Sequence, residues 1–292
     1  MQSGSQKSYL KLHLIVFIWG FTALLGALVS LQAMSLVWYR MVLACVMVGA
    51  YALFTKKSLL LTRKQILRLL IAGFVIALHW YTFFKAIKVS NVSITLACLS
   101  SGAFFVSLLN PLMQKKRINW KELGLSTIGI LGFCLIFSVE FHYWLGMTLA
   151  IISAILSAFF SVLNSNFVQK HHPVAITFYE LLGGVILFSV FLAFDGAFQP
   201  SFWHLSMSDW CYLALLSSVC TAYAFIGSVD VMKYLSPYTV MLTINLEPIY
   251  GIILAVLFLG KEEHMHSAFY IGVLLILGTL IWNAIMNKKT IQ

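Results

Sequence analysis

Residues Leu145–Phe167 read LGMTLAIISAILSAFFSVLNSNF, which is 23 positions without one Asp, Glu, Lys or Arg. Since a helix rises about 1.5 Å per residue, this segment is long enough to cross the roughly 30 Å hydrocarbon core of a bilayer. A strand of a membrane barrel would instead alternate apolar and polar residues over about ten positions. Irregular backbone cannot face lipid, so the segment predicts a transmembrane helix.

Nine further apolar segments of similar length account for most of the rest of the chain: Leu12–Val29, Ala33–Phe54, Leu69–Ile87, Val92–Met113, Leu123–Val139, Ala175–Phe194, Trp210–Met232, Tyr238–Leu259 and Ala268–Met286. Hydrophobic residues make up 61% of the 292 positions and charged residues only 10%, a composition that a soluble domain of this size would not tolerate. We therefore expect an all-α integral membrane protein with ten transmembrane helices. The first segment has no clear small-residue cleavage pattern after it, so we interpret it as retained and not as a signal peptide.

The basic residues fall mostly on alternate loops. With the N-terminus placed in the cytoplasm, fifteen of the 19 Lys and Arg lie on the inner side, three (Lys85, Lys88 and Lys261) lie on the outer side, and Arg40 lies within a span. The positive-inside rule then predicts that both termini are cytoplasmic. The formal charge of +10 is explained by this topology and by anionic inner-leaflet lipid, so no nucleic-acid partner is expected.

A faint internal repeat relates the two halves of the sequence. Val37–Met41 (VWYRM) resembles Thr177–Leu181 (TFYEL), 140 residues later, and Lys88–Val92 (KVSNV) resembles Lys233–Pro237 (KYLSP). These matches pair the first five spans with the last five and predict repeats at residues 1–143 and 144–292. Because five is odd, the second copy would enter the membrane from the opposite side, which gives inverted repeats.

Several short motifs carry a resemblance that covers almost the whole chain. Trp19-Gly20, Arg40, the segment Ala86–Ser93, Leu246-Glu247-Pro248 and Leu259–Glu262 together resemble the EamA branch of the drug/metabolite transporter superfamily. The sequence departs from relatives at Ser100-Ser101-Gly102, where many have a proline, and at Gln114–Arg117, where many have a Glu. The resemblance implies a carrier that commonly exports an amino acid or a related metabolite.

Glu247 lies nine residues into its expected span, near the bilayer midplane, where an ionisable side chain costs at least about 2.5 kcal/mol if it faces lipid. Pro248 follows it, lacks an N–H and is expected to break the helix there. Glu247 also belongs to a polar or small stripe at helical spacing that we expect to face a cavity: Thr239, Thr243, Glu247, Tyr250 and Gly251. The alternative is a structural kink whose Glu bonds to a neighbouring helix. Glu247 is the first candidate for proton coupling.

His79 and Arg40 are the other deep ionisable side chains. His79 lies near the midplane of its span and is a candidate substrate ligand or coupling group, or else a buried hydrogen-bonding partner between helices. Arg40 lies about seven residues below the outer edge of its span, too deep to reach the interface easily. Its guanidinium suits a carboxylate, which would belong either to a substrate or to a structural ion pair.

Trp19, Trp80, Tyr81 and Tyr223 are candidate aromatic walls for an organic solute, although many aromatic residues of a membrane protein only pack or face lipid. Glu180 and Asp230 are expected to be shallow, near helix ends, with structural roles. The glycines Gly129, Gly132, Gly183, Gly184, Gly227 and Gly251 are interpreted as close-packing positions.

We expect an inner-membrane secondary transporter that exports a small organic metabolite by alternating access, with proton coupling as a hypothesis. The alternatives are a channel-type facilitator, for which no pore-loop or voltage-sensor pattern is present, and an intramembrane enzyme, for which no nucleophile or HExxH motif is present. The five cysteines show no CxxC spacing, and we expect no metal, cofactor or catalytic site. The expected partners are a small-molecule solute and the bilayer, with a homodimer left open.

Overall fold

The computed structural model describes residues 2–263 and 265–289, and these form helices joined by short turns. The elements in chain order are α1 (Gln2–Leu28), α2 (Ala33–Phe54), α3 (Arg63–Val89), α4 (Val92–Leu99), α5 (Gly102–Gln114), α6 (Trp120–Val139), η1 (Phe141–Tyr143), α7 (Trp144–Phe167), α8 (Pro173–Phe194), α9 (Pro200–Trp203), α10 (Met207–Ser217), η2 (Ser218–Tyr223), α11 (Ala224–Val231), α12 (Pro237–Ile244), α13 (Glu247–Leu259), η3 (Gly260–Glu263) and α14 (Ser267–Lys289).

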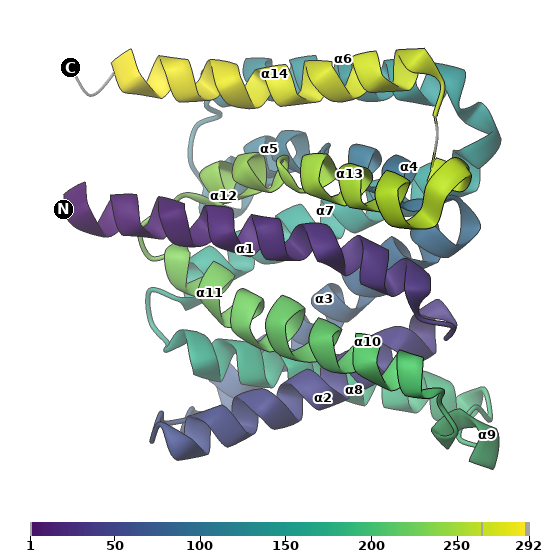
Figure 1. Ribbon diagram of the computed structural model, residues 1–292. Coiled ribbons are helices and arrows are strands. Elements are labelled where there is room, and N and C mark those ends of the chain that lie inside the picture. Colours follow the sequence, from purple (N-terminus) through teal and green to yellow (C-terminus); the bar gives the residue numbers. More distant parts are fainter. Residues whose placement is uncertain (1, 264, 290–292) are drawn as a thin grey trace.

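Within the described residues, nine helical segments are long and apolar enough to cross a membrane, and α14 adds a tenth apolar helix. Figure 1 shows them side by side, with both termini at the same end of the bundle and α9 at the opposite end. The protein is therefore an all-α, multi-pass membrane protein, as the hydropathy pattern predicted.

Two helices begin earlier than the apolar pattern predicted. The helix α1 begins at Gln2 and not near Leu12, and α3 begins at Arg63 and not near Leu69. At α3 the reason is a capping box, in which Thr62 and Gln65 bond to each other's backbone N–H groups before the apolar stretch starts. The added turns carry exposed basic residues, so hydropathy alone missed them.

The fourth and ninth spans are each split into two helices. The first break falls at Ser100-Ser101, between α4 and α5, and the second at Asn245-Leu246, between α12 and α13. Both split spans have the same length, and both breaks lie the same number of residues from the start, at Val92 and Pro237. The same break therefore occurs at equivalent positions of the two halves, which fits two five-helix repeats inserted in opposite directions.

Close backbone contacts hold the central helices together. The helix α3 packs along α7 and α8, and α1 packs along α13 and α11. At the α3–α8 crossing, a Cβ at Gly73 would overlap the backbone carbonyl of Glu180, and one at Gly183 would overlap that of Leu70. The helices α6 and α14 pair with each other at one edge, through Gly132 and Gly272 (Figure 1). A central cavity lies among α1, α2, α3, α4, α7, α11, α12 and α13.

Candidate functional site

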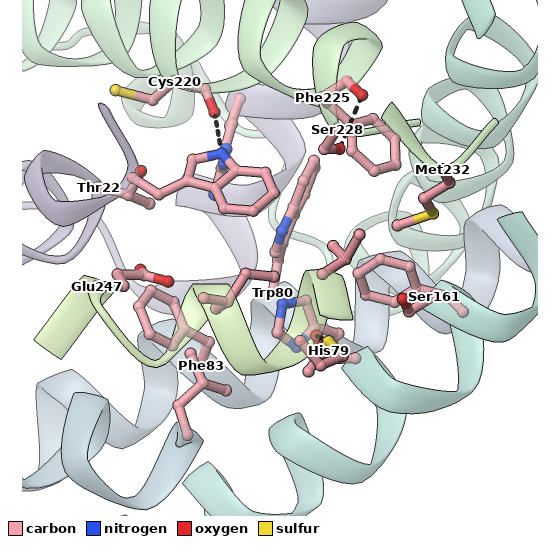
Figure 2. Close-up of a pocket in the computed structure, with 18 residues that line it drawn as sticks. Thr22, His79, Trp80, Phe83, Ser161, Cys220, Phe225, Ser228, Met232 and Glu247 are labelled. Carbon is pink, nitrogen blue, oxygen red and sulfur yellow. Dashed lines mark hydrogen bonds between the residues drawn. The ribbon is translucent and has the colours of Figure 1, made fainter. Parts of the chain in front are cut away.

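A cavity lies in the middle of the bundle and receives side chains from both halves of the chain. Its volume is about 70 Å³, counted as the space open to the centres of water molecules. Because one water needs about 10–15 Å³ on this measure, the cavity has room for several waters. It is lined by Trp19, Thr22, Arg40, His79, Trp80, Phe83, Leu99, Ser157, Phe160, Ser161, Cys220, Phe225, Ser228, Met232, Val240, Met241, Ile244 and Glu247. Figure 2 shows Glu247 and Thr22 on one side, and Ser161 and Met232 on the other.

Arg40 on α2 is the cation of this cavity, and only 2% of its surface is exposed. Its Nε donates to Thr221 Oγ1 at 2.6 Å, and its guanidinium carbon lies 3.9 Å from the centroid of the Trp80 ring. Its buried Nη1 has no hydrogen-bond partner among the described residues. Trp80 and Thr221 therefore fix the guanidinium in place and leave donor capacity for a further group.

The partner of Arg40 comes from an irregular turn that the sequence did not reveal. Residues Ser218–Tyr223 form a π-helical segment (η2) between α10 and α11. In this segment Thr221 Oγ1 donates to the Leu216 carbonyl, and the Cys220 carbonyl accepts the Trp19 indole N–H at 3.1 Å (Figure 2). The wider turn thus directs Thr221 and Cys220 into the centre, which is a common use of π-bulges at functional sites.

Glu247 is the acid of the cavity and begins α13, directly after the break in the ninth span. Its side chain is buried and lines the same cavity as Arg40. No ion pair joins them, however, since the ion pairs among the described residues involve Asp230 and Glu140. Pro248 occupies the first turn of α13, where a missing N–H is tolerated. An acidic and a basic side chain therefore line one cavity without an ion pair between them.

His79 on α3 both lines the cavity and connects two helices. Its Nδ1 lies 2.9 Å from the Ser153 carbonyl and 2.7 Å from the Ser153 hydroxyl, which itself donates to the His79 carbonyl. A carbonyl only accepts, so this contact assigns the hydrogen to Nδ1 and leaves Nε2 as an acceptor. The sequence had left open an interhelical bond or a ligand; the geometry shows an interhelical bond and also places His79 on the cavity wall.

Two of the candidate aromatic residues lie outside the cavity. Trp19 and Trp80 line it, whereas Tyr81 packs against Phe188 on α8 and Tyr223 is 52% exposed. Tyr81 is one residue beyond Trp80, which turns its side chain about 100° around the helix. Tyr223 is two residues beyond Thr221 and so lies on the opposite side of the turn. Neither tyrosine belongs to the candidate site.

The expected polar stripe along the ninth span does not form one face. The turn at Asn245-Leu246 interrupts it, so Glu247 lines the cavity while Tyr250 and Gly251 pack against α1 near Gly20. Glu180 lies seven residues after the start of α8 at Pro173, and its side chain is fully buried beside α3. Asp230 does lie near a helix end, where it pairs with Lys11 and Lys233 at 2.7 and 2.8 Å.

The sequence analysis missed the hydroxyl groups of the cavity. Ser157 and Ser161 line it from α7, and Thr22 and Ser228 line it from α1 and α11. A signal was present, because serines recur every four residues at 153, 157, 161 and 165 in an otherwise apolar span, which puts them on one helix face. A polar stripe on a transmembrane helix indicates a face turned away from lipid.

The fold and the site define a class of protein: a multi-pass membrane protein with two repeats, broken helices and a central cavity that holds a few ionisable side chains, features that recur in membrane transporters. Comparison with known families agrees. The EamA-like transporter family matches residues 6–138 and 144–285, once for each repeat. The chain belongs to this family and is a membrane transporter.

Individual relatives are distant. The chain is 23% identical over 284 residues to the uncharacterized transporter YxxF of Bacillus subtilis, covering 94% of this chain and 89% of the relative. It is 25% identical over 201 residues to an uncharacterized transporter of Archaeoglobus fulgidus, covering 68% and 70%. One solved crystal structure has the same fold, with a TM-score of 0.73 at 16% identity, over 98% of this chain and 99% of that chain.

Proposed function

We propose that this protein is an inner-membrane secondary carrier that exports a small zwitterionic metabolite, such as an amino acid, by alternating access. The observation that carries this proposal is the pair of unmatched charges in the cavity, Arg40 and Glu247. An α-amino acid offers a carboxylate to the guanidinium and an ammonium group to the carboxylate. Each contact is a charge-assisted hydrogen bond worth about 1.5–3 kcal/mol.

The rest of the cavity fits the remainder of such a solute. Phe83, Phe160 and Phe225 supply apolar walls, and the hydroxyls of Ser157 and Ser161 supply hydrogen-bonding groups. Because the cavity is small, the surrounding helices must separate to admit a solute much larger than a few waters. Movement of the helices is therefore part of the proposal, and the broken spans α4–α5 and α12–α13 supply places for it.

Polar contacts tie the two repeats together at both ends of the bundle. At the end that holds the termini, Lys11 on α1 pairs with Asp230 on α11 at 2.7 Å. At the opposite end, Asp209 on α10 accepts hydrogen bonds from the backbone N–H and hydroxyl of Ser30, at 2.7 and 2.6 Å. We infer that these contacts open alternately as the repeats rock against each other. The excess of Lys and Arg on the loops at the Lys11 end supports a cytoplasmic location for that end.

We propose that export is coupled to protons through Glu247, with His79 as the second coupling candidate. Protonation of Glu247 removes the negative charge that holds the ammonium group, so a proton from outside would compete with the solute and release it there. The Glu247→Gln variant keeps the shape of the side chain but fixes it as neutral. We expect this variant to transport more slowly, and we expect its residual transport to be independent of the pH gradient.

Comparing the medium of cells with and without overexpression tests the export claim. Metabolite profiling should show at least one amino acid or related zwitterion enriched by the wild-type protein and not by Arg40→Gln. The matched control is Tyr81→Phe, since Tyr81 packs away from the cavity, and it should export like the wild type. Enrichment of the same solutes by Arg40→Gln, or of no zwitterion at all, would refute the proposal.

A further inference from the structure

A second buried carboxyl group lies beyond the central cavity. Glu180 on α8 has none of its surface exposed, and Asn164 on α7 is equally buried. The Asn164 side-chain amide donates to Glu180 Oε2 at 3.3 Å. One turn before Asn164 on the same face of α7 lies Ser161, which lines the cavity. The polar face of α7 therefore runs from the cavity to this carboxyl group.

The unpaired atoms of the contact indicate its protonation. Among the described residues, Glu180 Oε1 and Asn164 Oδ1 are both buried and without a hydrogen-bond partner. A carboxylate would leave both of these atoms as buried acceptors, with no hydrogen for either, in two side chains that already touch through the amide. A carboxylic acid would donate its O–H to Asn164 Oδ1 while Oε2 accepts from the amide, so that the two side chains form a doubly hydrogen-bonded acid–amide pair. Only the neutral acid satisfies all of these atoms.

None of the described helices next to Glu180, namely α2, α3, α7 and α11, places a cation beside its carboxyl group. On α2, Arg40 faces the central cavity and the Cys45 thiol contacts the Phe178 carbonyl. On α3, His79 bonds to Ser153, while the basic residues lie toward the helix ends: Arg63, Lys64, Arg68, Lys85 and Lys88. On α11, Asp230 is paired with Lys11 and Lys233, and the described part of α7 carries no charged side chain. A buried carboxylate without a cation is strongly unfavourable, so neutralisation must come from a proton.

We propose that Glu180 is a second proton-binding site of the carrier, which holds its proton against Asn164 in this conformation and releases it to the central cavity in the opposite one. The release step rests on the proposed alternating access. Its support is the internal repeat, because Glu180 stands 140 residues after Arg40, at the matching position of the matching span. Inverted repeats exchange conformations during the cycle, so Glu180 would take up a cavity-facing position like that of Arg40. The proton then passes from the carboxyl O–H to cavity water and leaves a carboxylate.

Infrared spectroscopy of the purified protein without solute tests proton binding and does not depend on transport. At neutral pH we expect a carbonyl band of a protonated carboxylic acid that is absent from Glu180→Gln and still present in Glu247→Gln. Gln keeps the shape of Glu and pairs with an amide, so Glu180→Gln should fold. Asn164→Leu leaves Glu180 in place and removes the acceptor of its O–H, so it should shift the same band to higher frequency. If neither variant alters this spectral region, Glu180 is not protonated and the proposal fails.

Proteoliposomes that contain a mixture of radiolabelled amino acids test the release step. Glu180→Gln should still bind and exchange solute, but its net transport should respond differently to an imposed pH gradient than that of the wild type. If the infrared band is lost while the pH response stays unchanged, the proton of Glu180 is only structural and the release step is wrong. If wild-type protein moves no amino acid but the band is present, the proposed substrate fails while the proton site stands.

Discussion

The helices α3 and α8 cross in close backbone contact, because each has a glycine at the crossing. A substitution at this crossing tests whether the close contact keeps α3, and with it one wall of the cavity, in position. An ideal Cβ at Gly183 would overlap the Leu70 carbonyl oxygen and lie 2.9 Å from both the Leu70 carbonyl carbon and Cα. Carbon atoms pack at about 3.5–4.0 Å, so Gly183→Ala must move the helices apart by roughly 1 Å. The obstacle is backbone, which cannot turn away as a side chain can.

Overpacking of this kind costs about 1–3 kcal/mol. With a shift of roughly 2–4 °C per kcal/mol for a protein of this size class, the melting temperature in detergent should fall by about 2–12 °C. Because α3 carries His79 and Trp80, transport should weaken as well. The matched control is Gly129→Ala on α6, where a Cβ would meet nothing within 4 Å and helix propensity improves. Equal melting temperatures for Gly183→Ala and Gly129→Ala would refute this account of the packing.

Three further contacts are tested by substitution, each by thermal melting or solute binding. Glu263→Ala should lower the free energy of unfolding by at least about 2 kcal/mol, because the buried carboxylate accepts hydrogen bonds from the first two backbone N–H groups of α4. The control Asp230→Asn, in a half-exposed ion pair, should cost no more than about 1 kcal/mol, and a smaller loss for Glu263→Ala than for Asp230→Asn would contradict the role of Glu263 as the cap of α4. Thr221→Val keeps the shape of the side chain but leaves Arg40 Nε without its acceptor, so the affinity for the solute should fall by about tenfold or more. An unchanged affinity would show that Thr221 does not position the guanidinium. His172 accepts a hydrogen bond from the Val174 N–H at the start of α8, and burial together with Lys57 and Lys233 lowers the pKa of its imidazole. Its stabilising effect is therefore present above the unfolded pKa of about 6.5 and is lost as the pH falls below it. His172→Asn should reduce the fall of the melting temperature on acidification, and an unchanged fall would refute this role of His172.

The sequence was sufficient for the membrane fold because lipid imposes one solution on long apolar segments. Ala33–Phe54 was predicted from hydropathy alone and has the same bounds as α2. Arg40 and Glu247 were singled out because charge is costly at that depth, and both face the cavity.

The remaining features depend on backbone irregularities that hydropathy does not record. The π-helical turn at Ser218–Tyr223 changes which residues face the centre, so Thr221 was missed and Tyr223 was selected instead. The break at Asn245-Leu246 interrupts the stripe expected around Glu247. The structural role of Glu180 was predicted from its distance to the start of the apolar segment alone, and this distance gives no information about its hydrogen bond with Asn164. These contacts between distant segments become visible only when the helices are packed.

Counterflow in proteoliposomes measures the central claim most directly. Vesicles that hold wild-type protein and unlabelled amino acids should accumulate the labelled amino acid that the protein carries, with a rate that saturates with concentration. Arg40→Gln and Glu247→Gln should each reduce this exchange by at least about tenfold, because each removes one charge-assisted contact to the zwitterion. Flux that rises linearly with concentration would indicate a channel, and undiminished exchange in both variants would contradict the assignment of Arg40 and Glu247 as the binding pair.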